Sequence, residues 1–429
     1  MKKNFIALIC LVSMIFSPIY EACATKQKDN LLLQKEFNIN PSYEKSLKAF
    51  SKRNLNKIPK IFLDQIHEDF VHMNKPLINE KDLEATEKLI SKEKDKDFYF
   101  RVKIIDRKIY YHTNVDEKDH LFERFRYVMD AISIVNKSHT IPNVDFILYC
   151  GDVIYDNLKD FKAPIFVFAL NKTYINNKIL IPDALTLAER NWPSLYYYIN
   201  YLNKNIKWDD KISKAIWRGS STGNVKIDDS PNSNSTFDLR INNYFKFPRV
   251  KLVEFSNLHP DLIDAKFVSI VQADDKTKKI MTEKYGIAEY MSKIDQLKYK
   301  IQFTIDGNTA TYPGLLWRLR SNSVNLKVES DDYQWFNKFF KAGVDYVPVK
   351  RDLSDLKEKL EWAISHDKEA LKLSKHANKT IDKYLKPTDL YWYMYALLRE
   401  YSIIQTFYPK LDDRFVEYKS VEQRPCTKP

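Results

Sequence analysis

The sequence predicts an α/β protein that contains two parallel sheets. Short apolar segments with the composition of strands alternate with helical segments over about 300 residues, which is typical of parallel strands joined by helices. The chain has 429 residues, enough for two such units of roughly 150 residues each. Apolar residues make up 44% and charged residues 29% of the chain, so a disordered or low-complexity protein is excluded.

The first residues predict an export signal, a signal peptide over residues 1–24. Lys2 and Lys3 precede an apolar run from Phe5 to Phe16, and the small residues of Ala22-Cys23-Ala24 suit signal peptidase. We expect cleavage after Ala24 and export through the secretory pathway, to an endoplasmic reticulum lumen, a periplasm or the exterior. The alternative is an uncleaved N-terminal anchor.

Downstream of this signal no segment approaches about 18 apolar residues, so no transmembrane span is expected in the mature chain. Two of the four cysteines, Cys10 and Cys23, lie in the signal. At most one disulfide, between Cys150 and Cys426, can therefore form in the mature protein.

The N-terminal half is expected to begin with helices and to continue with a sheet. Apolar residues have helical spacing from Pro41 to His72, and a charged helix is expected from Asp82 to Lys94. The period then changes to that of paired strands at 98–105 and 108–111. The elements that follow are a helix over 121–135, a buried parallel strand over 144–150, a strand over 165–169 and a helix over 196–203.

The C-terminal half continues the alternation and ends in helices. A strand over 215–217 leads into the loop that begins at Arg218. Strands and helices then alternate through 262–267, 300–305, 315–319, 324–328 and 346–349. The tail from Leu353 to Tyr408 is almost wholly helical in its spacing.

Glycine is rare, and its positions are informative. Only 7 of the 429 residues are glycine, against a usual share of about 7%. Five of them, Gly151, Gly219, Gly223, Gly307 and Gly314, fall at or just after the ends of predicted strands. The carboxyl ends of strands are where open α/β sheets bind ligands, so these segments are candidate binding loops.

Two of these segments suit an anion. Residues 217–223 combine a fixed cation with small hydroxyl side chains and open backbone amides, which suits a phosphate or diphosphate; an ordinary hydrogen-bonded loop is the alternative. Residues 306–313 can open a helix whose N-terminus would face an anion.

The charge balance and the absence of several motifs exclude some classes of partner and enzyme. The net charge of +12 favours anionic partners. The lysines alternate with acidic residues, however, as over 81–97 and 357–375, which is typical of solvated helix faces. No nucleic acid partner is therefore expected. The chain has no GxGxxG, GxxxxGK[ST], GxSxG or HExxH motif. Asp95-Lys96-Asp97 has the spacing of a metal-diphosphate ligand, but a solvated turn is the expected reading.

Taken together, several segments resemble the CAP10-type glycosyltransferases, glycosyltransferase family 90. This family contains protein O-glucosyltransferases of the secretory pathway, fungal capsule-associated enzymes and bacterial lipopolysaccharide-modifying transferases. The resemblance extends from about Lys96 to Tyr384. It rests on KAIWRGS (214–220), DGNTATYP (306–313), SVNLKVES (323–330), Trp335-Phe336 and YVPVKRDLSDL (346–356).

The resemblance implies a GT-B-like architecture of two facing Rossmann-like domains. The expected boundaries are 25–205 for an N-terminal, acceptor-side domain and 206–385 for a C-terminal, nucleotide-sugar domain, with helices over 386–429 that pack back on the first. It also implies inverting transfer of a hexose or pentose from a UDP-sugar to a hydroxyl of a glycan or of Ser/Thr on a protein, without a cofactor or metal.

The resemblance also assigns the site residues. Asp152 matches the catalytic aspartate that takes the acceptor proton, with Asp156 as the rival. The residues that match the nucleotide-sugar site are Arg218, Gly219, Ser220, Thr222, Asp306, Gly307, Thr309, Ala310, Thr311, Arg318, Lys327 and Glu329. The chain departs from the O-glucosyltransferases at Ser221, where they carry a second arginine, and at Tyr312-Pro313, where they are Arg-rich; Arg318 is the expected substitute. A protein that binds glycan or nucleotide without turnover is the competing hypothesis.

Overall fold

The computed structural model describes residues 40–92, 98–188, 191–223 and 243–420. The predicted signal peptide, the Asp95-Lys96-Asp97 segment and Cys426 lie outside these residues. Cys150 is buried and free, and burial raises the pKa of its thiol. None of the helices that the structure describes is both long enough and apolar enough to span a bilayer.

The first sheet has six strands in the order β13-β2-β1-β3-β4-β6 and is parallel only in part. Strands β3, β4 and β6 are parallel, whereas β1 is antiparallel to both β2 and β3. A two-residue turn joins β1 to β2, and its residues Asp106 and Arg107 have φ of 48° and 68°, which suits a tight hairpin. The predicted strand pair is confirmed, but a wholly parallel first sheet is wrong. The strands are β1 (Tyr99–Ile105), β2 (Lys108–His112), β3 (Val144–Tyr149), β4 (Ile165–Val167), β6 (Lys178–Leu180) and β13 (Val416–Glu417).

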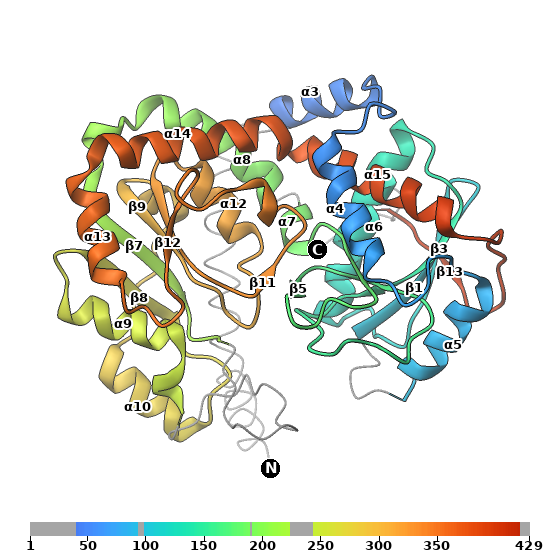
Figure 1. Cartoon of the computed structure of the whole chain (residues 1–429), viewed down its shortest axis with the longest axis horizontal. Helices are drawn as coiled ribbons and strands as arrows, with labels where there is room; N and C mark the ends of the chain where they lie inside the picture. Colours follow the sequence, from blue (N-terminus) through green and yellow to red (C-terminus); the bar gives the residue numbers. More distant parts are fainter. Residues whose placement is uncertain (1–39, 93–97, 189–190, 224–242, 421–429) are drawn as a thin grey trace, which may run out of the picture.

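Helices cover both faces of this sheet (Figure 1). One face carries Phe100, which stacks on Phe125 of α6, and Phe146, which contacts Tyr401 of α15. Helix α15 therefore packs against the first sheet although it follows the second in sequence. The helices of this half are α3 (Asn40–Ser51), α4 (Lys60–Val71), α5 (Glu80–Ile90), α6 (His120–Ser138), α7 (Ala184–Leu187), α8 (Trp192–Asn205) and α15 (Pro387–Ile404).

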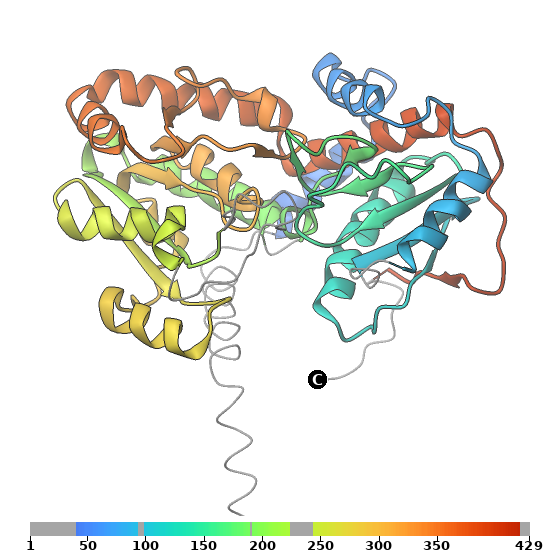
Figure 2. The ribbon, with the colours of Figure 1, turned by 60° about the horizontal axis from the view of Figure 1, so that its bottom comes forward.

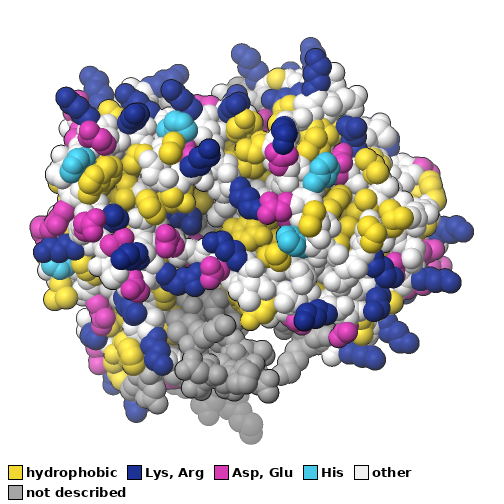
Figure 3. Space-filling model, viewed as in Figure 1, with side chains coloured by type: hydrophobic (Ala, Val, Ile, Leu, Met, Phe, Trp, Pro, Cys, Tyr) yellow, Lys and Arg dark blue, Asp and Glu magenta, His cyan; other side chains and the backbone are white. Residues whose placement is uncertain are grey.

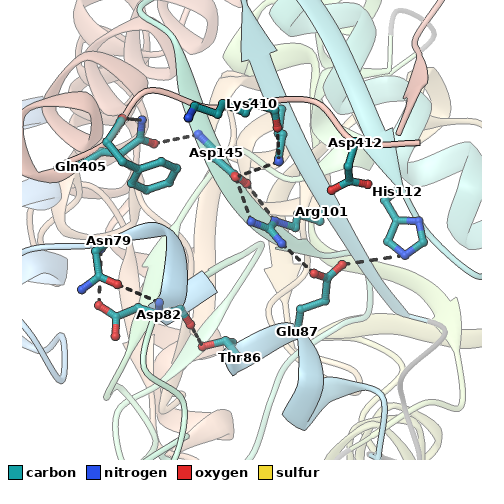
Figure 4. Close-up of polar contacts among 12 residues, drawn as sticks. Asn79, Asp82, Thr86, Glu87, Arg101, His112, Asp145, Gln405, Lys410 and Asp412 are labelled. Atoms are coloured by element: carbon teal, nitrogen blue, oxygen red, sulfur yellow. Dashed lines mark hydrogen bonds and ion pairs between the residues drawn. The ribbon is translucent and has the colours of Figure 1, made fainter. Parts of the chain in front are cut away.

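On the other face, a buried charge network ties α5 and the C-terminal tail to the sheet (Figure 4). Arg101 Nη2 lies 3.0 Å from Asp145 Oδ2, and its Nη1 lies 2.6 Å from Glu87 Oε2 on α5. Lys103 Nζ donates to the carbonyl of Lys410 in the tail at 2.5 Å. Because these charges are buried but partnered, loss of one partner would leave an uncompensated charge and strongly destabilise this half.

The second sheet is wholly parallel, as predicted. Its order is β12-β10-β9-β7-β8, and every neighbouring pair is parallel. The strands are β7 (Ile212–Ser220), β8 (Ile263–Ser269), β9 (Tyr299–Thr304), β10 (Val324–Val328) and β12 (Val347–Val349). The helices are α9 (Pro248–Leu258), α10 (Asp275–Tyr285), α11 (Lys293–Gln296), α12 (Pro313–Arg320), α13 (Leu356–Ser365) and α14 (Asp367–Tyr384), with short 3-10 turns at 208–210, 244–246 and 337–339.

The two sheets lie side by side, and each has its own hydrophobic cluster (Figures 1 and 2). A small antiparallel pair, β5 (Leu170–Asn171) and β11 (Asp332–Tyr333), joins the two halves. Helix α12 crosses this division, because it connects β9 to β10 but buries Leu316 and Trp317 in the cluster of the first sheet. The two predicted sheets are thus confirmed, while the GT-B-like arrangement and its domain boundaries stay a prediction.

Candidate active site

The candidate site begins at the point in the second sheet where the strand order reverses. Strand β7 has β8 on one side and β9 on the other, so the chain leaves β7 in one direction and returns in the other. A crevice forms at such a point, outside the carboxyl ends of the strands. Both predicted binding loops, after β7 and after β9, lie here, and a Cβ added to Gly307 would lie 2.6 Å from Thr222 Oγ1.

Arg249, near the start of α9, ties these two loops together. Its Nη1 donates to the carbonyl of Ser220 at 3.0 Å and to Thr222 Oγ1 at 2.7 Å. Its Nε donates to the carbonyl of Asp306 at 3.0 Å, and its Nη2 to that of Ile305 at 3.2 Å. The guanidinium is thereby fixed between the two loops by neutral oxygen atoms.

A second arginine faces the same place. Arg318 of α12 is 7% exposed, and its Nη1 donates to the carbonyl of Gly314 at 3.1 Å. Burial lowers the pKa of Arg318 to about 9, and the charge of Arg249 adds to this shift. Burial likewise lowers the pKa of Arg249 to about 10, against the opposing effect of Asp306. Neither arginine forms an ion pair with a described residue, although the carboxyl of Asp306 acts electrostatically on Arg249, so an anion would stabilise the two buried guanidinium groups.

Buried polar atoms without a partner gather beside these cations. Asp306 Oδ2, Asn308 Oδ1, Thr309 Oγ1 and Arg318 Nε have no hydrogen-bond partner among the described residues. Burial raises the pKa of Asp306, although the nearby Lys327 opposes this. Because buried polar groups are normally bonded, this cluster indicates a polar ligand that bonds to the loop after β9.

The predicted residues of the loop after β9 lie within this cluster. Thr309 and Ala310 are 2% and 6% exposed, and the amide of Thr311 bonds to Asp306. Tyr312, which precedes α12, has φ of 50°, a strained conformation for a non-glycine residue. The predicted helix start at Pro313 is confirmed.

Arg218 lies in a different environment. Its Nη2 lies 2.6 Å from Asp264 Oδ2 on β8, and its Nη1 donates to the carbonyl of Asp264 at 2.8 Å. Burial would raise the pKa of Asp264, but Arg218 holds it below its ordinary value. Ser220 Oγ remains 3.3 Å from Thr222 Oγ1, and Gly219 packs against the ring of Trp217. The structure thus brings Ser220 and Thr222 to the loops and pairs Arg218 with a carboxylate.

Asp152 follows β3 and contacts the loop after β9 from the first half of the molecule. Its Oδ1 accepts from Arg124 Nη1 at 2.9 Å, and its Oδ2 from Asn308 Nδ2 at 3.3 Å. Its carbonyl accepts from Tyr312 Oη at 2.7 Å. Burial would lower the pKa of Arg124, but Asp152 holds it above the ordinary value. The exposed carboxylate of Asp156, in contrast, accepts from the adjacent amide of Asn157.

Two adjoining cavities open beside these loops. The smaller, of about 110 Å³, is lined by Asp306, Gly307 and Glu329 among others, and the larger, of about 460 Å³, by Lys327. Both are lined by Ser330 and Asp332, so they meet at the end of β10. Within the described ranges, no three His, Cys, Asp or Glu side chains are grouped to hold a metal ion.

Sequence reasoning missed Arg249, Arg124, Asn308 and Tyr312. Pro248-Arg249 has the signature of a helix start, with proline at the first position, and this was the available signal for Arg249. Arg124 lies in the predicted helix 121–135, where its charge gives no indication of a partner that follows β3. Their roles depend on the order of strands in the sheets, which the sequence does not reveal.

Comparison with known sequences covers most of the chain. The sequence pattern described as glycosyl transferase family 90 matches residues 56–427. Protein O-glucosyltransferase 3 of Mus musculus is 28% identical over 297 residues, which are 67% of this chain and 53% of that protein. Protein O-glucosyltransferase 2 of Danio rerio is 25% identical over 312 residues, or 70% of this chain and 56% of that protein. The chain spans about half the length of these relatives, but the family pattern covers far more than half of the chain. The protein therefore belongs to glycosyl transferase family 90.

Proposed function

We propose that this protein transfers a hexose or pentose from a UDP-sugar to a hydroxyl group of a protein. The main support for the proposal is the pair of buried guanidinium groups of Arg249 and Arg318, which have no ion-pair partner among the described residues, beside the loop that contacts Asp152. A nucleoside diphosphate supplies the anion that these cations would bind, and the named activity of the relatives supports a protein acceptor. A glycan hydroxyl is the other acceptor that the family resemblance allows.

In this proposal the reaction is a single displacement with inversion and needs no metal. Asp152 takes the proton of the acceptor hydroxyl while its oxygen attacks the anomeric carbon, and the bond from that carbon to the diphosphate oxygen breaks. Arg249 and Arg318 stabilise the negative charge on the departing UDP, and the hydroxyl of Thr309 donates to the diphosphate. Asn308 orients the Asp152 carboxylate through its hydrogen bond. Glu329 and Lys327 bind the nucleotide, and Arg218, predicted for the diphosphate, remains a second candidate.

Two contacts favour the alternative of a binding protein without turnover. Arg124 Nη1 lies 2.9 Å from Asp152 Oδ1 and Asn308 Nδ2 lies 3.3 Å from Oδ2, so each of the two oxygens that could take the proton already accepts one hydrogen bond. Catalysis then requires that a remaining lone pair of the Asp152 carboxylate faces the acceptor.

UDP release tests the proposal without a known acceptor. The full chain is incubated with UDP-glucose, UDP-xylose, UDP-galactose and UDP-N-acetylglucosamine in the presence of EDTA, since slow donor hydrolysis reveals a transferase. We expect release from one donor, unchanged by EDTA and lost in Asp152→Asn, while the matched variant Asp156→Asn keeps it. If only Asp156→Asn abolished UDP release, Asp156 would be the catalytic base. UDP binding without release from any donor would favour a binding protein without turnover.

A further inference from the structure

Helix α14 carries a continuous stripe of lysines on its outer face. Lys368, Lys372, Lys375, Lys379 and Lys383 are all exposed, and their spacing of three or four residues places them on one side of the helix. The opposite side buries Leu373, Ala377 and Ile381. The stripe is about 22 Å long at the helical rise per residue.

Within the part of the chain that the structure describes, these lysines have no acidic partners. None of the five forms an ion pair with a described residue, and Asp367 and Asp382 of the same helix bond instead to Lys300 and Arg320. Helices α4 and α13 show the ordinary arrangement, with Lys60–Asp64 and Lys357–Glu361 paired one turn apart. Like charges one turn apart destabilise a helix, so the α14 stripe has a cost that the mixed faces avoid. The lysines and acidic residues that alternate in the sequence over 357–375 therefore lie on different faces of the folded helices.

Helix α3 extends this charge along the same edge of the molecule. Its lysines Lys45 and Lys48, and Lys52 just after it, are exposed and also without an ion pair among the described residues. Both ribbon views place α3 and α14 along one edge, and dark blue side chains gather over both helices (Figures 1, 2 and 3). We call these eight lysines the basic rim. Two carboxylates on these helices, Glu44 and Glu369, are exposed, while Asp367 and Asp382 are paired with Lys300 and Arg320.

We propose that the basic rim binds the surface of an anionic lipid bilayer. Lysine is a compact, strongly hydrated point charge that responds to charge density rather than to the shape of a partner, and a row of lysines along an edge matches a plane of headgroup phosphates and carboxylates.

The test compares two sets of charge reversals in the full chain. The rim variant carries Lys372→Glu, Lys375→Glu and Lys379→Glu, and the control carries Lys276→Glu, Lys278→Glu and Lys279→Glu, which are exposed on α10. Both variants change the net charge by the same amount. Sedimentation with vesicles of phosphatidylcholine alone, or with about 30% phosphatidylserine, measures binding at about 100 mM and at about 500 mM NaCl.

We expect the wild-type chain to bind phosphatidylserine vesicles more tightly than phosphatidylcholine vesicles and to lose this difference at high salt. The rim variant should lose at least roughly tenfold of the phosphatidylserine-dependent binding, and the control less than about twofold. Equal loss in both variants would show that net charge alone acts, and heparin binding without vesicle binding would point to a soluble polyanion; either result overturns the proposal. UDP binding should be unchanged in both variants, because neither set of lysines touches the candidate site. The rim variant should unfold at the wild-type temperature or slightly above it, because it relieves like-charge repulsion along α14.

Discussion

At the scale of single residues, the two arginines near β7 differ in one respect that decides their roles. Arg218 has a carboxylate partner in Asp264, whereas the hydrogen bonds of Arg249 to described residues all go to neutral oxygens. A guanidinium that already has a carboxylate partner gains less free energy from binding a diphosphate than a guanidinium without such a partner. A hydrogen bond to a charged group contributes about 1.5–3 kcal/mol, which corresponds to roughly ten- to hundredfold in affinity.

Arg249→Gln should therefore weaken UDP binding by roughly ten- to hundredfold. Arg218→Gln should change UDP affinity less than about threefold but lower the unfolding temperature, because it leaves Asp264 without its partner. Calorimetric titration with UDP and thermal unfolding of both variants measure the two effects. If Arg218→Gln abolished UDP binding and Arg249→Gln did not, the diphosphate contact would belong to Arg218.

A second residue makes stability depend on pH. Asp69 of α4 is 2% exposed, accepts from Gln65 Nε2 at 2.9 Å and from the amide of Leu180 at 2.8 Å, and burial raises its pKa to about 8. The folded state thus holds this proton while the unfolded chain releases it near pH 4, so the contribution of Asp69 to stability is lost as pH rises from about 4 to about 8.

Asp69→Asn should remove this loss. Its amide can donate to Gln65 Oε1, which has no partner among the described residues, once the Gln65 amide turns over. We expect little change at pH 4 and a gain of several kcal/mol at pH 8, at about 1.4 kcal/mol for each unit by which the pKa is raised, measured by urea unfolding across this range. Asp64→Asn, at an exposed position of the same helix, is the control and should show no such trend. A gain that does not vary with pH would contradict the explanation.

At the scale of elements, the loop after β9 depends on close approach at Gly307. A Cβ there would lie 2.6 Å from Thr222 Oγ1 and 2.9 Å from Arg249 Nη2. Gly307→Ala should displace Arg249 and weaken UDP binding by roughly tenfold or more. Gly343→Ala is the control, because its φ of 74° strains alanine although nothing lies within 4 Å of the added Cβ. It should lower stability by about 1 kcal/mol and leave UDP affinity unchanged. Equal UDP affinities in the two variants would argue against the loop as the diphosphate site.

Local pattern was sufficient for single strands of apolar composition and for a pair of strands joined by a tight turn. The hairpin of β1 and β2 and the buried strand β3 follow from composition and period alone. The contact of Arg218 with Asp264 does not, because it requires β8 beside β7. Nor does the contact of Arg249 with Thr222 and Asp306, which joins three segments far apart in sequence.

At the scale of the whole molecule, the first and second sheets meet through contacts that no segment reveals by itself. Helix α12 connects two strands of the second sheet and contacts them, yet its Leu316 and Trp317 belong to the hydrophobic cluster of the first half, and the helix also packs against α8 of that half. Asp152 and Asn308, which are 156 positions apart, are brought within hydrogen-bond distance by this packing. The predicted residues therefore lie on both sides of one site, although the sequence gives only their separate loops.

Tyr155 links the two halves next to this site, so its hydroxyl should affect turnover more than donor binding. Its Oη lies 2.9 Å from the carbonyl of Asn308 and 3.1 Å from Asp332 Oδ2, and Asp332 Oδ1 accepts from Asn171 Nδ2 at 2.6 Å. Tyr155→Phe removes one of the links between the loop of Asp152 and that of Asn308, and it should lower stability by about 1 kcal/mol. We expect kcat for UDP release to fall roughly tenfold, the effect of a misplaced base, with UDP affinity within about threefold of wild type. Tyr174→Phe is the matched control, since the ring of Tyr174 packs 6.0 Å from that of Tyr155, and its loss of a hydroxyl should leave both quantities unchanged. A fall in UDP affinity that matches the fall in kcat would instead place Tyr155 in the nucleotide site.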